Sequence, residues 1–463
     1  MRKHYHFIGI GGTGLSPIAR ILLEQGHCVS GSDLLLSPLA LELQDMGAVV
    51  YEGHKAEQID DADIVIRSSA VNDNNVEVKA ARQAGIPVLK RIDFLGELTD
   101  SFSLIAIAGT HGKTTTTSMA AWVLNKLELD PSYIIGGTSK NLDKNAHAGN
   151  GDYFVIEADE YDHMFLGLIP NYLIITNIEH DHPDCYPTKQ EYVQAFQDLV
   201  DRVPEKGTIL VCADDAQAYQ IGQYAQENKR KVIFYGTDEK ASYRIDSIEH
   251  CEHQGVSFVL HLPNGQSIEQ ILDVPGEHNA RNASAILALC HILGFSLEKV
   301  VQALSTFSGS KRRFDILGTF NGITLIDDYG HHPTEIEATV CAARNRYPNQ
   351  RIFTVWQPHT YSRTQELFDD YLDVFRSSDV VIVTEIYKSR EKEQDYSSSL
   401  IAGKIHHANT KFIAELEDVV SYLKKELHES DVVVVLSAGD ANRINQDLIS
   451  LFNSPEKTRR EHA

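Results

Sequence analysis

The sequence predicts an α/β protein built from three domains, over residues 1–100, 101–307 and 308–463. The first observation is the length of 463 residues, which exceeds what one hydrophobic core usually supports. The second is a repeated alternation of short apolar runs with helical patterns, which is typical of a parallel sheet covered by helices. The third is that several apolar runs end in glycine-rich or polar clusters, where open parallel sheets bind their ligands.

In the first domain, five short apolar runs are expected to form parallel strands, over residues 6–10, 28–30, 49–51, 63–66 and 86–89. The first run leads into Gly9-Ile10-Gly11-Gly12-Thr13-Gly14, a G-x-G-x-x-G sequence that precedes an amphipathic helix. Asp33 follows roughly 20 residues later, as in dinucleotide-binding domains. Taken alone, this fingerprint suggests NAD. A glycine turn that serves only helix and strand packing is the structural alternative.

The central domain opens with Ala108-Gly109-Thr110-His111-Gly112-Lys113-Thr114-Thr115-Thr116-Thr117, which joins an apolar strand to a helix. Backbone N–H groups at such a helix N-terminus point at phosphate oxygens, and a lysine side chain can neutralise them. The hydroxyl of Thr114 can join the shell of a magnesium ion. The spacing departs from G-x-x-x-x-G-K-[ST], because only two residues separate the glycines. A turn that merely caps a helix is the alternative. The expected phosphate-binding residues are Gly109, Thr110, His111, Gly112, Lys113, Thr114 and Thr115.

Two further apolar runs of this domain, residues 153–160 and 173–182, end in acidic and histidine side chains. Because parallel strands end at the same edge of a sheet, these groups are expected to converge on the phosphate loop. Glu157 is the first choice for a magnesium ligand, although Asp159, Glu160 and Asp162 lie close to it. His182 is a weaker choice, because imidazole suits transition metals better. Zinc is the poorer interpretation, since the segment has no cysteine partners.

The third domain repeats the pattern, with strands expected near residues 323–326, 351–355, 380–384 and 432–436. At its start, Arg312-Arg313 offers a cation for a transferring phosphoryl group, with a solvated basic turn as the alternative. Asp328 is placed to accept hydrogen bonds from a ribose diol. The groups that suit a carboxylate or a diphosphate are His331, His332, His359 and Arg363.

The amino-acid composition argues against several classes of partner and location. Lys and Arg number 42 against 65 Asp and Glu, and the formal net charge of −23 argues against a nonspecific nucleic-acid or anionic-membrane surface. Six cysteines are scattered without a C-x-x-C pair, which fits reduced thiols. No apolar run approaches a membrane span, and we do not expect the first residues to act as a signal peptide. We therefore expect a cytoplasmic protein with no nucleic-acid or membrane partner, as a monomer or homodimer.

Taken together and in order, these clusters resemble the ATP-dependent Mur ligases of peptidoglycan synthesis, over nearly the whole chain. The segments that carry the resemblance are residues 6–12, 109–116, 157–160, 177–182, 278–282, 312–314, 327–335 and 357–364. The resemblance implies a Rossmann-like UDP-binding first domain, a central P-loop ATPase domain and a Rossmann-like third domain. UDP thereby replaces NAD as the expected ligand of the first domain.

The resemblance also implies a reaction in the bacterial cytoplasm. ATP would phosphorylate the lactyl carboxylate of UDP-N-acetylmuramate, and the amine of L-alanine would attack the acyl phosphate. Mg²⁺ is the expected metal, with Mn²⁺ as a substitute, held by Thr114, Glu157 and His182. The implied catalytic residues are Lys113, Glu157, His182, Arg313, His331 and Arg363. Asn279, Asn282, Arg313 and Asp328 would complete the ATP site. The UDP-sugar would contact Gly11, Gly12, Thr13, Gly14, Ser32, Asp33, Ser69, Tyr329, His331 and Arg363.

Three positions depart from the family pattern. Thr360 stands where some members carry an arginine, so binding of the substrate carboxylate or phosphate is expected to differ. Phe196 falls where ligases that add later residues carry a carbamoylated lysine, so no carbamate bridge between metals is expected. Ser437 replaces the usual first glycine of the segment 437–440.

Three rival functions remain at this point. The first is a recycling ligase that joins a whole tripeptide to UDP-N-acetylmuramate, against which the segment 357–364 argues. The second is a catalytically silent sensor of UDP-sugar and ATP, which the presence of Lys113, Glu157, His182 and Arg313 disfavours. The third is a dehydrogenase, which has no use for a phosphate loop.

Overall fold

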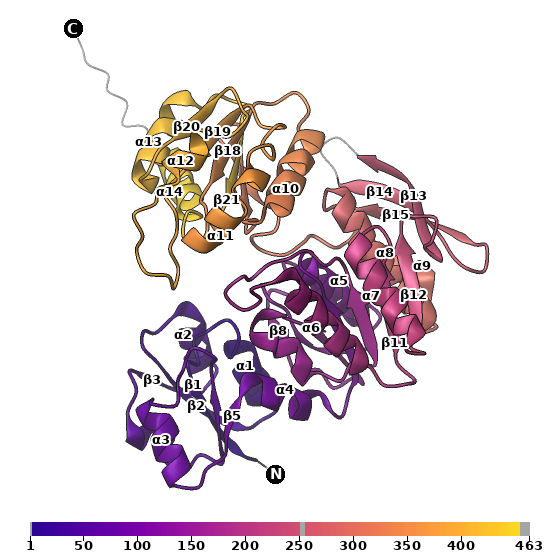
Figure 1. Ribbon diagram of the computed structural model, residues 1–463, viewed down its shortest axis with the longest axis vertical. Helices are drawn as coiled ribbons and strands as arrows, with labels where there is room; N and C mark the ends of the chain where they lie inside the picture. Colours follow the sequence, from indigo (N-terminus) through magenta and orange to yellow (C-terminus); the bar gives the residue numbers. More distant parts are fainter. Residues whose placement is uncertain (1, 251–254, 454–463) are drawn as a thin grey trace. The chain divides into compact units, whose positions relative to one another are not determined.

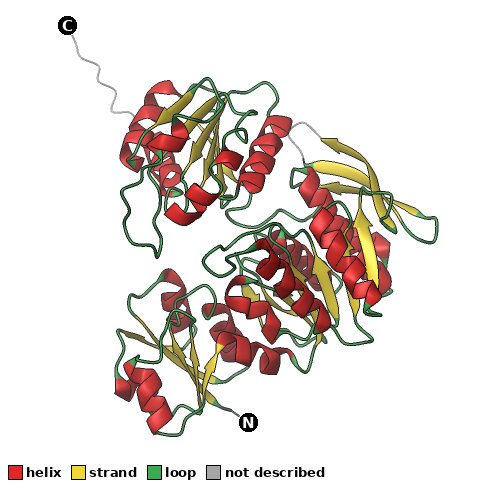
Figure 2. Ribbon diagram, viewed as in Figure 1, coloured by secondary structure: helices red, strands yellow, loops and turns green. Residues whose placement is uncertain are grey.

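The computed structural model describes residues 2–250 and 255–453, so that Cys251 lies outside the described residues (Figure 1). Three sheets are each flanked by helices (Figure 2). The contacts divide the chain into two compact units. The first comprises Met1–Ser247, Phe258–Gln270 and Arg281–Phe307, and the second comprises Ile248–Ser257, Ile271–Ala280 and Ser308–Ala463. The α/β architecture predicted from the sequence is confirmed.

The first sheet is fully parallel, with strand order β3-β2-β1-β4-β5. Its order reverses beside β1, and ligands of open parallel sheets bind outside the carboxyl ends at such a point. The glycine loop follows β1 at this edge. The strands are β1 His4–Ile8, β2 Cys28–Asp33, β3 Val49–Glu52, β4 Ile64–Arg67 and β5 Val88–Lys90. The helices are α1 Ser16–Glu24, α2 Pro38–Asp45, η1 Ala56–Ile59, α3 Val76–Gln83 and α4 Arg91–Thr99.

The second sheet has ten strands in the order β15-β14-β13-β12-β11-β10-β6-β9-β7-β8. The strand before the phosphate loop, β6, lies between β10 and β9 and is parallel to both. The strands are β6 Ser103–Ala108, β7 Ser132–Ile134, β8 Ala146–His147, β9 Tyr153–Glu157, β10 Tyr172–Ile175, β11 Thr208–Cys212, β12 Lys231–Gly236, β13 Tyr243–His250, β14 Val256–His261 and β15 Ser267–Leu272. The helices are α5 Lys113–Lys126, η2 Tyr161–Gly167, α6 Lys189–Asp201, α7 Ala216–Glu227, α8 Glu277–Ile292 and α9 Leu297–Ser305.

One apolar core joins the first two sheets. It contains Phe7 of β1, Phe94 of α4 and Phe165 of η2, all of them buried. The backbones of α4 and η2 approach closely, since a Cβ on Gly167 would lie 2.2 Å from the carbonyl oxygen of Ile92. The first two domains therefore pack against each other within the first unit.

The third sheet has the order β16-β17-β21-β18-β19-β20, with β16 antiparallel and the other strands parallel. Its central strand β21 is buried at every position and reads Val-Val-Val-Val-Leu, as expected for a strand covered on both faces. The strands are β16 Asp315–Phe320, β17 Ile323–Asp328, β18 Ile352–Trp356, β19 Val380–Val383, β20 Thr410–Phe412 and β21 Val432–Leu436. The helices are α10 Pro333–Arg346, α11 Tyr361–Glu366, η3 Asp369–Tyr371, α12 Ser399–Ala402, α13 Leu416–Glu426 and α14 Arg443–Asn453.

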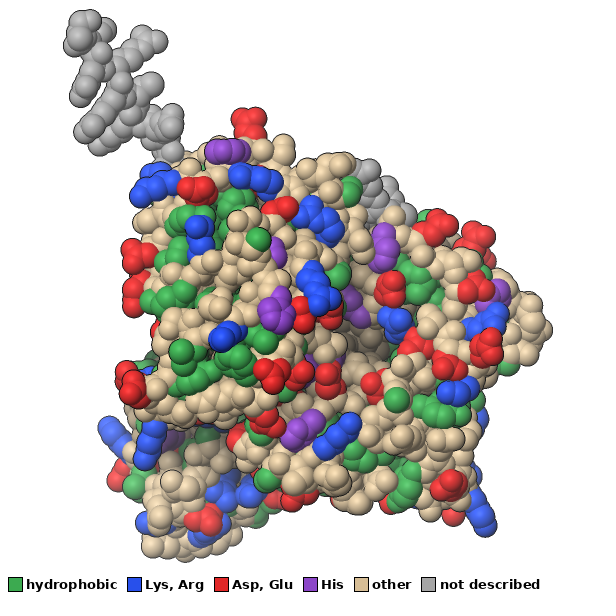
Figure 3. Space-filling view, turned by 45° about the horizontal axis from the view of Figure 1, so that its top comes forward, with side chains coloured by type: hydrophobic (Ala, Val, Ile, Leu, Met, Phe, Trp, Pro, Cys, Tyr) green, Lys and Arg blue, Asp and Glu red, His purple; other side chains and the backbone are tan. Residues whose placement is uncertain are grey.

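The surface is charged and mixed. Acidic, basic and histidine side chains are interspersed over the face that Figure 3 shows. Within residues 2–250 and 255–453, none of the helices combines the length and the apolar character that crossing a bilayer requires.

Candidate active site

The glycine loop of the first domain is braced from the neighbouring strand. Gly9 has a φ of +88°, a conformation that favours glycine. The N–H of Gly11 donates to Asp33 Oδ2 at 2.9 Å, and its carbonyl accepts from Ser37 Oγ at 2.9 Å. Asp33 thus fixes the loop that follows β1. Gly12 and Thr13, which come next in the loop, are exposed.

Ser32 and Ser69 lie in different surroundings. Ser32 is buried and donates to Glu77 Oε2 at 2.6 Å, and the same oxygen lies 2.8 Å from His54 Nδ1. Glu77 is itself fully buried and also bonds His6. Ser69 follows β4 and is exposed. The structure therefore places Ser69 on the surface at the carboxyl edge and the Ser32 hydroxyl inside the domain.

The phosphate loop needs its two glycines for geometric reasons. Gly109 has a φ of +132°, and a Cβ there would lie 2.1 Å from Thr176 Oγ1. Gly112 has a φ of +82° at the N-cap of α5. The strand end of β10 fixes the rest of the loop, because His111 N donates to Asn177 Oδ1 at 2.8 Å. Hydrogen bonds within the protein therefore define the shape of this loop.

The structure separates the acids that the sequence left as alternatives around Glu157. Glu157 accepts a hydrogen bond from Thr114 Oγ1 at 3.1 Å through Oε1 and from Gly136 N at 2.7 Å through Oε2. Asp159 lies 3.6 Å from Arg91, and Glu160 pairs with Lys113. A hydroxyl and a carboxylate in contact are oxygen donors of the kind that Mg²⁺ prefers, so Thr114 and Glu157 fit this metal.

The side chain of Lys113 is hydrogen-bonded within the phosphate loop and to a neighbouring acid. Its Nζ donates to the carbonyls of Gly109 at 2.6 Å and Thr110 at 2.9 Å, and to Glu160 Oε1 at 2.9 Å. Burial alone would lower the pKa of Lys113, but the charges of Glu160, Glu157 and Asp159 outweigh it and raise that pKa. The lysine is therefore a charged donor at neutral pH.

His182 lies near the same acid. Its Nε2 is 3.8 Å from Glu160 Oε1 and 3.7 Å from Asp181 Oδ2. The backbone at His182 has a φ of +57°, which is uncommon for a residue other than glycine. The structure thus places Lys113 and His182 against Glu160, an acid that the sequence left as an alternative to Glu157.

The two asparagines expected in the ATP site are placed differently. Asn282 is buried beside the phosphate loop, since a Cβ on Gly112 would lie 2.9 Å from its Oδ1. Asn279 is buried too, and its Nδ2 donates to the carbonyl of Pro275 at 2.7 Å. Both belong to α8.

In the second unit, the paired arginines flank Tyr329. The guanidinium carbons of Arg312 and Arg313 lie 5.0 and 5.1 Å from the centre of the Tyr329 ring, within the range of a cation–π contact. Arg313 Nη1 donates to Glu335 Oε1 at 3.4 Å, and Arg312 Nη2 donates to the carbonyl of Ser437 at 2.5 Å. Arg312 is thus fixed to the loop after β21.

Asp328 ends β17 and organises the backbone around it. Its carboxylate accepts from Phe314 N at 2.7 Å, Gly330 N at 2.6 Å and Thr339 Oγ1 at 3.2 Å. Burial raises its pKa. Its neighbour Asp327 is also buried, and burial raises the pKa of that carboxyl to about 6.

Three predicted groups of the second unit form one cluster. The rings of His331 and His359 lie 5.8 Å apart, and Arg363 Nη1 is 3.0 Å from His359 Nδ1. Arg363 is buried on α11. The carbonyl of His331 accepts from Tyr371 OH at 2.8 Å. Tyr329 joins the cluster, with its ring 5.7 Å from that of His331.

The three departures have definite structural roles. Thr360 has a φ of +65° and caps α11 by accepting a hydrogen bond from Arg363 N. Phe196 is fully buried in α6 with its ring 5.3 Å from those of Phe165 and Tyr192. Ser437 is fully buried, donates to Gln357 Oε1 at 2.6 Å and accepts from the N–H groups of the following loop. Its hydroxyl therefore organises the loop that glycine was expected to begin.

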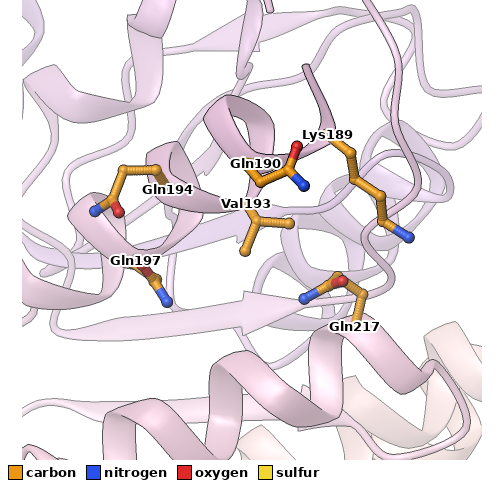
Figure 4. Close-up of a pocket in the computed structure, with 6 residues that line it drawn as sticks. All are labelled: Lys189, Gln190, Val193, Gln194, Gln197 and Gln217. Atoms are coloured by element: carbon orange, nitrogen blue, oxygen red, sulfur yellow. The ribbon is translucent and has the colours of Figure 1, made fainter.

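A pocket of about 340 Å³ is lined by residues of α6 and α7 (Figure 4). It contains none of the residues predicted for the site and offers mainly amide side chains. The lining residues are Lys189, Gln190, Val193, Gln194, Gln197 and Gln217. We assign it no part in the chemistry of the strand edges.

Sequence reasoning missed Arg91, named Glu160 only as an alternative to Glu157, and gave Gln357 no role of its own. Each follows a strand at a carboxyl edge: Arg91 comes directly after β5, Glu160 three residues after β9 and Gln357 directly after β18. Position at that edge was therefore the signal that would have found them.

Three family models match successive parts of the chain. They are described as the Mur ligase family, catalytic domain, over residues 4–103, the Mur ligase middle domain over residues 107–290, and the Mur ligase, glutamate ligase domain over residues 312–439. Together they span the three sheets.

Known proteins that align with nearly the whole chain are also named as ligases. The UDP-N-acetylmuramate–L-alanine ligase of Caldanaerobacter subterraneus is 37% identical over 452 residues, which cover 96% of this chain and 97% of that protein. The crystal structure of the UDP-N-acetylmuramate–alanine ligase of Thermotoga maritima has a TM-score of 0.81 at 28% identity and covers 97% and 99% of the two chains. A murein peptide ligase of Psychrobacter arcticus has a TM-score of 0.71 at 24% identity, covers 98% and 99%, and shares the fold.

Proposed function

The chain belongs to the Mur ligase family, and on that premise we propose that it joins L-alanine to the lactyl carboxylate of UDP-N-acetylmuramate with ATP as the energy source. Its whole length aligns with a relative named for this reaction. One observation of the structure carries the proposal: Lys113, Thr114 and Glu157 meet at the carboxyl edge of the central sheet. A buried charged lysine beside a hydroxyl and a carboxylate is suited to phosphoryl transfer.

In the first step, an oxygen of the lactyl carboxylate attacks the γ-phosphorus of ATP, and ADP leaves. The N–H groups at the start of α5 and the ammonium of Lys113 bind phosphate oxygens there. Lys113 must exchange its present bonds to the loop carbonyls and Glu160 for those oxygens. Such fixed donors stabilise charge that develops during the transfer.

The side chains that would bind the metal ion indicate what the ion contributes. Thr114 and Glu157 would hold Mg²⁺, with His182 as a further ligand, and the metal supplies neutralisation of phosphate charge when it is bound. Glu157 is kept in position by Gly136 N and Thr114 Oγ1. Within the second unit, Arg313 is supported by Glu335 and is a further cation suited to a transferring phosphoryl group.

In the second step, the amine of L-alanine attacks the carbonyl carbon of the acyl phosphate. The amine loses a proton, the C–N bond forms, and phosphate leaves. His331 and Arg363, together with His359, are the groups of the second unit that suit a carboxylate or a phosphate. We propose that they bind the amino acid and the anionic end of the sugar substrate.

This activity places the protein in peptidoglycan precursor synthesis, and hence in cell wall formation, cell shape and cell division. Both nucleotide substrates are cytoplasmic molecules, so we propose the bacterial cytoplasm as its location.

The recycling ligase that adds a tripeptide is the nearest alternative. The murein peptide ligase of Psychrobacter arcticus shares the fold at 24% identity. The relative named for alanine addition is 37% identical over nearly the whole chain, which favours alanine.

Isotope transfer tests the chemistry of the proposal. UDP-N-acetylmuramate labelled with ¹⁸O in its lactyl carboxylate is incubated with ATP, Mg²⁺ and L-alanine, and the released phosphate is analysed by mass spectrometry. We expect one ¹⁸O atom in each phosphate released, because the carboxylate oxygen stays on phosphorus when the amide forms. Unlabelled phosphate accompanying amide formation would exclude an acyl-phosphate intermediate.

A further inference from the structure

A segment that follows β19 lies against the residues before α11, within the second unit. We call this segment, residues 387–391, the brace. Tyr387 N donates to the carbonyl of Pro358 at 2.9 Å, and Thr360 N donates to the carbonyl of Tyr387 at 2.9 Å. These bonds form a parallel bridge at His359, beyond the ends of β18 and β19. The backbone on both sides of His359 is therefore tied to the brace.

The ring of Tyr387 packs against the ring of His359. The two rings are stacked, with their centres 5.9 Å apart and their planes at 19°. The loop after β21 contacts Tyr387 too, because a Cβ on Gly439 would lie 2.5 Å from Tyr387 Cγ. The ring of His331 lies 5.8 Å from that of His359. Tyr387 thus extends the cluster of His331, His359 and Arg363 into the segment after β19.

Glu391, at the other end of the brace, holds the first turn of α11. Its Oε2 accepts from Tyr361 N at 2.6 Å, and both of its oxygens accept from Ser362 N at 3.3 Å. Its Oε1 also accepts from the hydroxyl of Ser362. The next N–H of the helix, that of Arg363, donates to Thr360 Oγ1 at 3.4 Å. A helix of six residues is too short to be stable by itself, so its position depends on such contacts.

The helix α11 carries Arg363, whose guanidinium bonds His359. Arg363 Nη1 lies 3.0 Å from His359 Nδ1. Because a guanidinium only donates, Nδ1 is the acceptor in this bond, and the ring carries its proton on Nε2. The other N–H groups of the pair are donors, of the kind that a carboxylate accepts. The brace contacts both members of the pair, His359 through the Tyr387 ring and the helix of Arg363 through Glu391.

We propose that Tyr387 and Glu391 are positioning residues, which hold His359 and Arg363 in place for the carboxylate of L-alanine. This inference rests on the proposed function, which supplies the amino acid. Of the three substrates, L-alanine is the one for which no binding group is expected in the first unit. Its carboxylate is the part of the molecule that a guanidinium recognises through paired hydrogen bonds. Both positioning residues act through this pair and not by contact with the ligand.

Steady-state kinetics with each substrate varied in turn test the role of Glu391. We expect Glu391→Ala to raise the KM for L-alanine about tenfold, because hydrogen bonds to a charged group are lost at the start of α11. The KM values for ATP and UDP-N-acetylmuramate should stay close to those of the wild type. Glu391→Gln, which keeps an acceptor oxygen, should have a smaller effect than Glu391→Ala. Glu393→Gln, at an exposed acid that pairs with Lys388 in the same segment, is the matched control.

The same kinetics test Tyr387. Tyr387→Ala should raise the KM for L-alanine, because the ring of His359 loses its stacked neighbour. Tyr387→Phe keeps an aromatic ring at this position. It should therefore recover most of the affinity for L-alanine that Tyr387→Ala loses.

A double-mutant cycle separates positioning from a general effect on folding. Arg363→Lys keeps the charge and loses the planar fork that fits a carboxylate. Because Glu391 acts through Arg363 in this account, Glu391→Ala should raise the KM for L-alanine much less in the Arg363→Lys background than in the wild type. Two independent effects would multiply instead.

Three results would overturn the inference while leaving the proposed function intact. One is an unchanged KM for L-alanine in Glu391→Ala and Tyr387→Ala. Another is an equal rise in the KM values for all three substrates, which would show a general structural role. The third is a pair of effects that multiply in the cycle of Glu391 and Arg363. If the wild type did not turn over with L-alanine, the proposed function would fail and this inference with it.

Discussion

At the scale of single residues, Lys113 is the residue on which the proposed phosphate loop depends most. Three acceptors surround its ammonium, and nearby carboxylates raise its pKa despite burial. In the proposed reaction, the triphosphate takes the place of Glu160 and the loop carbonyls as the partner of this charge. The free-energy cost of burying the ammonium is offset by these three acceptors within the protein itself.

Lys113→Ala is expected to abolish ATP-dependent ligation, lowering kcat by at least about a hundredfold, because the developing phosphate charge loses its fixed cation. The affinity for UDP should not change, since the glycine loop is formed by other residues. Steady-state kinetics and calorimetry with UDP measure the two effects. Lys126→Ala, which removes an exposed lysine from the same helix, serves as the control. Turnover retained in Lys113→Ala would refute the assignment of the phosphate loop.

Ser437 stands where the family pattern has glycine, and its hydroxyl organises the loop through hydrogen bonds. Its hydroxyl contacts Gln357 and two backbone N–H groups inside a fully buried turn. Ser437→Ala should destabilise the protein by about 1–3 kcal/mol, because those buried groups lose their partner. Thermal unfolding checks this, with the exposed Ser450→Ala as the matched control. Equal melting temperatures for Ser437→Ala and the wild type would show that the hydroxyl does not hold the loop.

At the scale of elements, Glu24 fastens α1 of the first domain to β8 of the central domain. It accepts from His147 Nδ1 at 2.9 Å and Ala148 N at 2.7 Å, and lies 3.4 Å from Lys144 Nζ. Burial alone would raise the pKa of Glu24. The hydrogen bonds from His147 and Ala148 outweigh burial and lower that pKa to about 2.

A depressed carboxyl pKa contributes stability above the unfolded value and loses it as the pH falls through the folded value. The shift of Glu24 from 4.5 to about 2 therefore contributes about 3 kcal/mol at neutral pH, which is lost between about pH 4.5 and pH 2. Glu24→Gln should melt below the wild type at pH 7, and the difference should shrink toward pH 2. Glu42→Gln, at a half-exposed acid paired with Arg20, is the control. A difference that stays constant with pH would contradict this role of Glu24.

The elements that could be predicted from sequence are those with a strong local signal. The run Val432–Leu436 and the glycine turns after β1 and β6 specify strand, turn and helix by composition alone. The alternating strand β14 was missed, because its burial on one side depends on neighbours that the sequence does not name. Arg91 was missed, and Glu160 was named only as an alternative to Glu157, for a related reason. Their partners Lys113 and Gly14 are distant in the chain, and only the fold brings them into contact.

At the scale of the whole molecule, the candidate groups are divided between two compact units. The phosphate loop and the glycine loop belong to the first, whereas Arg313, His331 and Arg363 belong to the second. A ligase that activates one substrate and then admits another needs groups for both. The family match over all three domains accounts for this division.

The measurement that tests the central claim most directly is phosphate release from ATP and Mg²⁺ in the presence of UDP-N-acetylmuramate. L-Alanine is compared with the tripeptide L-Ala-γ-D-Glu-diaminopimelate, and NADH oxidation serves as a control for the dehydrogenase alternative. We predict release that depends on L-alanine, with no oxidation of NADH. Release with the tripeptide alone, or with neither acceptor, would contradict the account.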